Sequence, residues 1–366
     1  METVKRLVFF IAVIPVITFA HVKQEWVARY SYQENDRDSA SALAVDSYGN
    51  VFVTGKSMGS DSTFDYATVK YNSEGREQWA TRYNGSGDGN DKAYAIAVDS
   101  RCNIYVTGMS DQPNSYGDYA TIKYNPRGKQ KWIGLYNGTG NIVDDAFFIA
   151  LDSEGNVYVT GESRILSTEV KYAVVKYNSR GKRQWAARFN SFGLGRDWFK
   201  PRASAVDASG NVYATGSDYI TVKYNTQGRL EWAADYICGE NGYGDAHGIA
   251  LDSAGNVYVT GFSKDSVGWG DYATIKYDPQ GRRQWVARYD GTAHGMDWAT
   301  AVAVDAPGNV YVTGYSYGYS DRLSTGFDYV TIKYNTQGKE EWLARYNGPV
   351  SRNDKPGRST VKPPNR

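Results

Sequence analysis

The sequence is poor in cysteine and histidine, and it has no excess of charge of either sign. Its 366 residues include two cysteines and three histidines, and 41 lysines and arginines are balanced by 40 aspartates and glutamates. Without a basic surface, neither a nucleic acid nor an anionic membrane is expected as a partner. Cys102 and Cys238 fall in different kinds of loop of the repeat described below, so we expect no disulfide between them.

Long apolar runs are missing after the first twenty residues. Lys5 and Arg6 precede an uncharged run that ends at Ala20, shorter than the roughly twenty residues that a membrane-spanning helix needs. This pattern predicts an export signal over residues 1–20, cleaved after Ala20, and an uncleaved N-terminal anchor is the alternative. Both place the folded part outside the cytoplasm, as a secreted, periplasmic or cell-surface protein. After cleavage no membrane span is expected.

The sequence is instead rich in tyrosine and tryptophan, with 31 and 10 residues, and it repeats itself. One segment recurs six times, as DSYGNVFVTG at 46–55, DSRCNIYVTG at 99–108, DSEGNVYVTG at 152–161, DASGNVYATG at 207–216, DSAGNVYVTG at 252–261 and DAPGNVYVTG at 305–314. A second segment follows each copy, as in DYATIKYDPQGRRQW at 271–285. A fixed period of this length indicates a repeat architecture.

Each repeat divides into four short strands separated by turns. In the fifth copy these are 246–251, 256–261, 272–277 and 284–289, here called strands a, b, c and d. Tight turns that contain glycine join a to b and c to d, and variable loops join b to c and d to the next a. Repeated four-stranded antiparallel units are typical of propeller blades, so we predict an all-β propeller of six blades, with seven as the alternative.

The motif GNVYVTG followed by DYATIKYNxxGxxQWxARYNG resembles the bacterial SBBP repeat, named for a seven-bladed β-propeller, and more distantly the NHL repeat. The resemblance covers residues 24–348 and implies the fold and an extracytoplasmic setting. It implies no catalytic residues, because the family has no catalytic motif of its own. This chain differs from the family name in having six complete units.

The repeat divides the chain into a signal peptide at 1–20, a propeller at 21–348 and a disordered basic, proline-rich tail at 349–366. Strands a, b and c occur six times, whereas the strand d pattern occurs seven times, because residues 24–30 also match it. Either 24–30 or 340–346 can complete the last blade, and the repeat pattern leaves this open.

Candidate functional residues are those that the repeat does not explain, especially in the long loops, since loops on a rigid scaffold commonly carry function. Trp198 and Trp298 are expected in d–a loops and Trp269 in a b–c loop, and exposed aromatic residues can stack on sugars or anchor a protein. Phe199 is a further candidate in the same d–a loop as Trp198. This loop is long and the following b–c connection, after Gly216, is short, so we predict a notch beside the short connection that is lined by the aromatic residues of the long loop. His247 and His294 are the remaining ligand-binding candidates.

Aspartates also recur just before strand a, where they are expected to surround the mouth of the central channel. They are Asp38, Asp91, Asp144, Asp197, Asp245 and Asp297. A ring of carboxylates is a weak candidate for calcium, although no single segment has the spacing of a calcium loop. We otherwise expect no cofactor.

Together these patterns predict a monomeric propeller that is a non-catalytic binding or structural module, with a protein or a glycan as its partner at the long-loop face. No catalytic residue is assigned, because no motif of a known nucleophile, metalloprotease or phosphate loop is present. The alternative is a glycosidase or lyase that acts on a polysaccharide with carboxylates at the channel mouth.

Overall fold

The computed structural model describes residues 24–32, 37–87, 89–166, 169–189, 200–236, 242–264, 269–320 and 323–347. This part of the chain forms six four-stranded antiparallel sheets and contains no helix. Each sheet is one copy of the repeat, with its strands paired in the order a-b-c-d. The predicted six-bladed propeller is therefore confirmed. No described segment forms a helix capable of crossing a membrane.

The blades are numbered 1 to 6 in chain order. Blade 1 consists of β1 (Asp38–Val45), β2 (Val51–Met58), β3 (Phe64–Tyr71) and β4 (Glu77–Tyr83), and blade 2 of β5 (Asp91–Val98), β6 (Ile104–Gln112), β7 (Ser115–Tyr124) and β8 (Gln130–Tyr136). Blade 3 consists of β9 (Asp144–Leu151), β10 (Val157–Leu166), β11 (Glu169–Tyr177) and β12 (Arg183–Phe189), and blade 4 of β13 (Pro201–Val206), β14 (Val212–Gly216), β15 (Thr221–Tyr224) and β16 (Leu230–Ala234). Blade 5 consists of β17 (Tyr243–Leu251), β18 (Val257–Lys264), β19 (Asp271–Tyr277) and β20 (Arg283–Tyr289), and blade 6 of β21 (Asp297–Val304), β22 (Val310–Ser320), β23 (Leu323–Tyr334) and β24 (Glu340–Tyr346).

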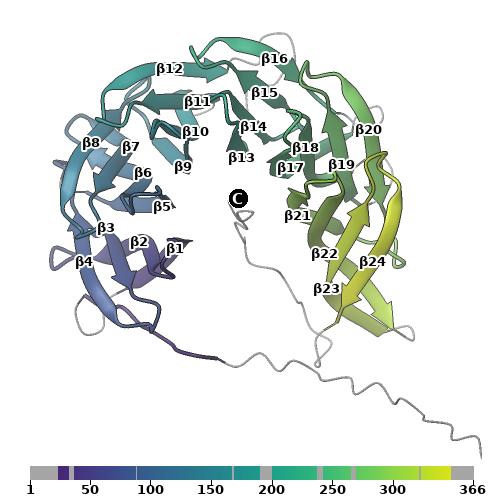
Figure 1. Ribbon diagram of the computed structural model, residues 1–366, viewed down its shortest axis with the longest axis horizontal. Helices are drawn as coiled ribbons and strands as arrows, with labels where there is room; N and C mark the ends of the chain where they lie inside the picture. The colour runs from purple at the N-terminus through teal and green to yellow at the C-terminus, as the bar shows by residue number, and fades with distance from the viewer. Residues whose placement is uncertain are drawn as a thin grey trace, which may run out of the picture.

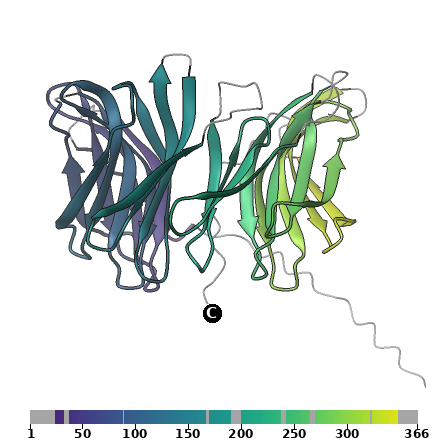
Figure 2. The same cartoon turned by 90° about the horizontal axis from the view of Figure 1, so that it is seen from above.

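The blades follow one another along an arc around a central space, with strand a innermost and strand d outermost (Figure 1). Blades 1 and 6 do not meet, so the arc stays open between them (Figure 1). Seen from the side, the tight a–b and c–d turns lie on one face, and the ends of the b–c hairpins rise from the other (Figure 2). We call the second face the long-loop face.

The core is built between neighbouring blades, not within one sheet. Tyr258 and Tyr272 of blade 5 are fully buried, and they pack against Ala299, Val312 and Val330 of blade 6. Large rings on one sheet thus fit against small and β-branched residues of the next. Since each blade presents both kinds of surface, the same packing recurs at every junction along the arc.

A tryptophan of strand d fastens each blade to the next one. Its indole Nε1 donates a hydrogen bond to a carbonyl in the next c–d turn, and its ring lies against the glycine of that turn. The pairs are Trp79 with Pro126 (3.0 Å), Trp132 with Ser179 (3.2 Å), Trp185 with Thr226 (2.9 Å), Trp232 with Pro279 (3.0 Å) and Trp285 with Thr336 (3.1 Å).

The strand d pattern occurs once more than the blades need, at residues 24–30, and this extra copy makes the same tryptophan contact. β24 pairs with β23, so residues 340–346 complete blade 6 and the open question of the sequence is resolved. Trp26, by contrast, donates to the carbonyl of Ser73 at 3.2 Å and lies against Gly75 of blade 1. Residues 24–30 therefore lie where strand d of a blade preceding blade 1 would lie.

Three other expectations fall partly or wholly outside the described residues. They concern the signal at 1–20, the tail at 349–366 and Cys238. Cys102 is a free thiol in the a–b turn of blade 2. It adopts a φ of 58°, a place that glycine takes in the other five a–b turns.

Candidate functional site

The structure places four of the six predicted ligand-binding residues at the junction of blades 5 and 6. Trp269 lies in the b–c loop of blade 5, as expected, and its indole is 63% exposed. One position was wrong, because Trp298 is the second residue of β21 and not part of a d–a loop. His247 lies within β17, in the strand a predicted at 246–251. His294 lies in the loop before β21 and is exposed. Trp198 and Phe199 lie outside the described residues.

Aromatic rings form a continuous row across this junction, which we call the aromatic strip. Its members are Tyr243, Phe262, Trp298, Tyr315 and Phe327, with ring centroids 5.5, 4.2, 6.0 and 5.1 Å apart in that order. The strip begins at an exposed ring, since Tyr243 is 53% exposed. Trp298, partly buried, stacks on Tyr315 across the β21–β22 pair, with an angle of 20° between the rings. The loop that carries Trp269 reaches the strip, since the next residue, Gly270, packs against Phe262.

Carboxylates lie beside the strip in the same junction. Oxygens of Asp271, Asp290 and Asp297 all lie within 4.8 Å of one another. Asp271 pairs with Arg288 at 2.7 Å, and Asp290 accepts a hydrogen bond from the His294 ring at 2.6 Å, which raises the pKa of that imidazole. Burial raises the pKa of Asp297 to about 6. The junction thus combines exposed rings with hydrogen-bond acceptors.

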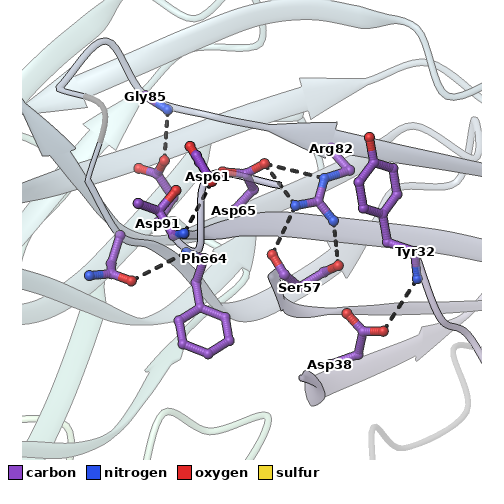
Figure 3. Close-up of polar contacts among 11 residues, drawn as sticks. Tyr32, Asp38, Ser57, Asp61, Phe64, Asp65, Arg82, Gly85 and Asp91 are labelled. Carbon is purple, nitrogen blue, oxygen red and sulfur yellow. Dashed lines mark hydrogen bonds and ion pairs between the residues drawn. The ribbon is translucent and has the colours of Figure 1, made fainter. Parts of the chain in front are cut away.

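The aspartates expected at the channel mouth serve mainly to hold loops. Asp91 accepts a hydrogen bond from the backbone N–H of Gly85 at 2.7 Å, and the Tyr32 N–H donates to Asp38 at 3.4 Å (Figure 3). Asp144 and Asp297 accept the N–H of Gly138 and Gly291 in the same way. These carboxylates tie each d–a loop to the start of strand a.

Asp245, another member of the expected ring, does not follow this pattern. Asp245 is paired opposite Phe262 in blade 5, whereas Asp297 is paired opposite Ser316 in blade 6. Asp245 therefore lies one residue further along its strand a than Asp297 does. It forms an ion pair with Arg202 of blade 4 at 2.9 Å. Asp197 lies outside the described residues. The regular ring of six carboxylates expected from the sequence is therefore wrong at Asp245, and the ring stays only a weak candidate for calcium.

A second network supports the same loops near the outer edge. Arg82 of β4 binds Asp65 of β3 at 2.8 Å and the backbone carbonyl of Ser57 at 2.9 Å (Figure 3). Its guanidinium also lies 4.0 Å from the centroid of the Tyr32 ring. Equivalent pairs join Arg288 to Asp271 and Arg345 to Asp328. Because they recur, we read these ion pairs as structural.

Two carboxylates that the sequence analysis missed face each other in blade 3. Asp145 of β9 is paired directly opposite Glu162 of β10, whose side chain is 6% exposed. Glu162 is balanced by Arg164 at 3.3 Å and Lys200 at 3.7 Å. Burial, followed by the charge of Glu162, raises the pKa of Asp145 to about 6. Like charges at directly opposed positions weaken a sheet, so this pair is a feature that the fold does not require.

Replacing Asp145 with asparagine should therefore stabilise the protein at neutral pH. The raised pKa means that the folded chain holds this proton more tightly than the unfolded chain, whose ordinary pKa is 3.8. Stability is thus lost as the pH rises from about 4 to about 6. At pH 7.5 we expect Asp145→Asn to raise the free energy of unfolding by about 1–2 kcal/mol. The gain should vanish near pH 4, as thermal unfolding at the two pH values would show.

Asp252→Asn provides a control of opposite sign. Burial acts to raise the pKa of Asp252, but hydrogen bonds from Asn256, Tyr258 and the Ala254 N–H outweigh it, and the pKa is lowered. The charged form therefore contributes stability that is present at pH 7.5 and lost as the pH falls. Asparagine at this position should lower the melting temperature. Equal effects of the two substitutions would contradict our account of Asp145.

The short b–c connection of blade 4 spans residues 217–220 and packs against blade 5. Asp218 donates its N–H to the carbonyl of Gly244 at 2.8 Å, and Ser217 forms a bridge with Asp245. The start of β17 thus lies beside the shortened hairpin. Whether an aromatic notch forms there depends on Trp198 and Phe199, so the notch remains a prediction.

The fold and the repeat place the protein among the β-propellers, as a single arc of six blades. A model of the SBBP beta-propeller repeat matches residues 25–61, 78–114 and 238–264, so the chain carries this repeat and the resemblance seen in its sequence is confirmed. No curated protein shows significant sequence similarity to the chain.

Two solved structures show a distant similarity to the chain. A protein of unknown function from Bacteroides caccae is 12% identical, with a TM-score of 0.43, over 78% of this chain and 93% of that one. A structure described as the eukaryotic initiation factor is 9% identical, with a TM-score of 0.44, over 84% of this chain and 78% of that one.

Proposed function

We propose that the protein is a non-catalytic, extracytoplasmic binding module that binds a glycan at the aromatic strip on its long-loop face. The observation that carries this proposal is the row of five rings across blades 5 and 6, with the exposed Trp269 beside it. That the protein is exported is inferred from the basic residues and the apolar run of positions 5–20.

The chemistry around the strip favours a glycan over an apolar protein segment. Flat rings can stack on the C–H faces of sugars, and the carboxylates of Asp271 and Asp290 can accept hydrogen bonds from sugar hydroxyls. Both groups are accessible, since Trp269 is 63% exposed and the Asp290 side chain is 43% exposed. Both carboxylates also have protein partners, Arg288 and His294, which leave acceptor sites on their oxygens for a sugar hydroxyl.

A glycan array probed with the chain from residue 21 onward tests the proposal. We expect binding to at least one polysaccharide, and a double substitution of Trp269 and Tyr243 by alanine should weaken it about tenfold or more. Tyr48→Ala is the matched control, because this ring is 74% exposed in an a–b turn on the opposite face. Glycan binding that survives the double substitution would refute the site, and binding of a protein alone would refute the ligand class.

The second candidate is a glycosidase or lyase, and the opposed pair of Asp145 and Glu162 favours it. Two neighbouring carboxyl groups, one with a pKa of about 6, are the kind of pair that general acid catalysis uses. Release of reducing ends from a bound polysaccharide, lost in Glu162→Gln with binding retained, would support catalysis. Binding with no release would leave the module non-catalytic.

A further inference from the structure

The carboxylates beside the aromatic strip include one that the repeat does not account for. In four copies of the repeat, the aromatic residue that ends strand d is followed by asparagine, at Asn84, Asn137, Asn190 and Asn347. The corresponding residue of blade 5 is Asp290, and blade 5 alone has an acidic residue at this place. Since asparagine suffices in other blades, the fold does not require the charge of Asp290.

The loop that follows Asp290 holds its carboxylate beside two others. The His294 N–H donates to the Gly291 carbonyl at 2.8 Å, and His294 adopts a φ of 45°, so the loop turns back on itself. Oxygens of Asp271, Asp290 and Asp297 lie within 4.8 Å of one another. Asp297 is fully buried, and its Oδ1 accepts no hydrogen bond from the described residues. Such an acceptor needs a donor from outside this part of the chain.

The negative charge of this group exceeds the charge of the cations that pair with it. Arg288 pairs with Asp271 at 2.7 Å, and the His294 imidazole, when protonated, pairs with Asp290 at 2.6 Å. Asp297 forms no ion pair with a described residue, so its charge is left over. An excess of negative charge beside a binding surface attracts cationic ligands and repels anionic ones.

A backbone hydrogen bond ties these carboxylates to the aromatic strip. The Asp297 N–H donates to the carbonyl of Gly270 at 2.8 Å, and Gly270 lies between Trp269 and Asp271 in the sequence. Trp298, a member of the strip, follows Asp297 directly. Aromatic faces attract cations as well as the C–H faces of sugars. Stacking on the rings and pairing with a carboxylate can therefore act on one sugar chain.

We propose that the aromatic strip selects glycans with free amino groups, and that the carboxylate of Asp290 binds the ammonium group of an amino sugar. Asp290 is the accessible member, with its side chain 43% exposed, and Asp271 and Asp297 add their charge behind it. The inference rests on the proposed glycan site and names its substrate class. An N-acetylated sugar lacks the charge for this ion pair, and the carboxylate of a uronic acid is repelled.

Two hexasaccharides with the same linkage test the selection, since a glucosamine hexamer has amines where an N-acetylglucosamine hexamer has amides. Isothermal titration calorimetry uses the chain from residue 21 onward near pH 6.5, where Asp297, with a pKa of about 6, is still mostly charged. We expect the amine form to bind about tenfold more tightly. Added salt should reduce this preference, because it screens charges. Equal binding of the two, or tighter binding of a galacturonate hexamer, would overturn the inference.

Asp290→Asn removes the charge and keeps the fold, because asparagine holds this place in other blades. The variant should lose the preference for the amine form and bind the N-acetylated form as the parent does. Asp61→Asn is the matched control, since it removes the same charge from an exposed b–c loop in blade 1. This control should keep the preference. A preference that survives Asp290→Asn would assign the selection to other residues and refute the inference.

The experiment separates this inference from the glycan site on which it rests. A neutral glycan may bind with no advantage for the amine form, and Trp269→Ala with Tyr243→Ala may abolish that binding. The site then stands, and the selection of amino sugars alone is refuted. If neither hexamer nor any glycan of the array binds, both proposals fail.

Discussion

Gly161→Ala is expected to disrupt blade 3 and to cost about 3 kcal/mol or more of stability. A Cβ at Gly161 would overlap the backbone carbonyl of Asp145 and lie 2.8 Å from the Cα of Ala146. Neither obstacle can rotate away, because both belong to β9, the neighbouring strand of the same sheet. β9 and β10 would have to move apart at a point where they are joined by backbone hydrogen bonds.

The cause of this crowding is a β-bulge in strand a. The register of β9 and β10 shifts between Thr160 and Gly161, which leaves Phe147 as the extra residue. The bulge bends strand a toward its neighbour at every blade, and each blade has glycine at this place. The repeated Thr-Gly of strand b is thus a packing requirement, because only glycine admits so close a backbone.

Gly155→Ala in the same blade is the matched comparison. Gly155 adopts a φ of 77° in the a–b turn, but a Cβ there would meet only Ser179, at 3.5 Å. The left-handed conformation alone should cost about 1–2 kcal/mol. Thermal unfolding and soluble yield should therefore rank parent, Gly155→Ala and Gly161→Ala in descending order. If the last two ranked equally, backbone overlap would not be the cause.

The blade architecture could be predicted from the sequence because every blade repeats the same local signals. The a–b turn of blade 5 is an example, since Gly255 donates its N–H to the carbonyl of Asp252 while the Asp252 carboxylate accepts from three later residues. Such contacts are local, and six copies make them easy to recognise. Which terminal segment packs on blade 1 could not be predicted in this way. The choice between Trp26 and Trp342 depends on contacts between the two ends of the chain, and the local signals of the repeat are the same in both segments.

The candidate site could be predicted only in part, because its strand residues vary between blades and the repeat pattern therefore gives no signal at those positions. His247 is the bulge residue of β17, and Trp298 holds the place in β21 that Asp145 holds in β9. Counting from the Thr-Gly of strand b would have shown that neither place is held by one repeated residue type. The aromatic strip itself could not be predicted, because it joins two blades through ring contacts that only the packing of the sheets defines.

Tyr219→Ala is expected to loosen blade 4 from blade 5 at a cost of about 3–5 kcal/mol. The side chain is fully buried and packs with Tyr213, Ala246 and Val257. It comes from the short b–c connection of blade 4, so no longer loop is available to fill the space that it would leave. Hydrogen exchange should then rise in β15 and β17, the strands on either side of the cavity.

Tyr219→Phe separates packing from the hydrogen bond. The hydroxyl donates to the carbonyl of Ala273 in blade 5 at 2.9 Å, and that carbonyl also accepts from the Thr260 hydroxyl at 3.2 Å. Since the acceptor keeps a partner, phenylalanine should cost only about 1 kcal/mol. A loss as large as that of Tyr219→Ala would mean that the hydrogen bond, and not the filled volume, joins the blades. The small loss expected here means that neighbouring blades are joined mainly by the fit of large rings against small residues.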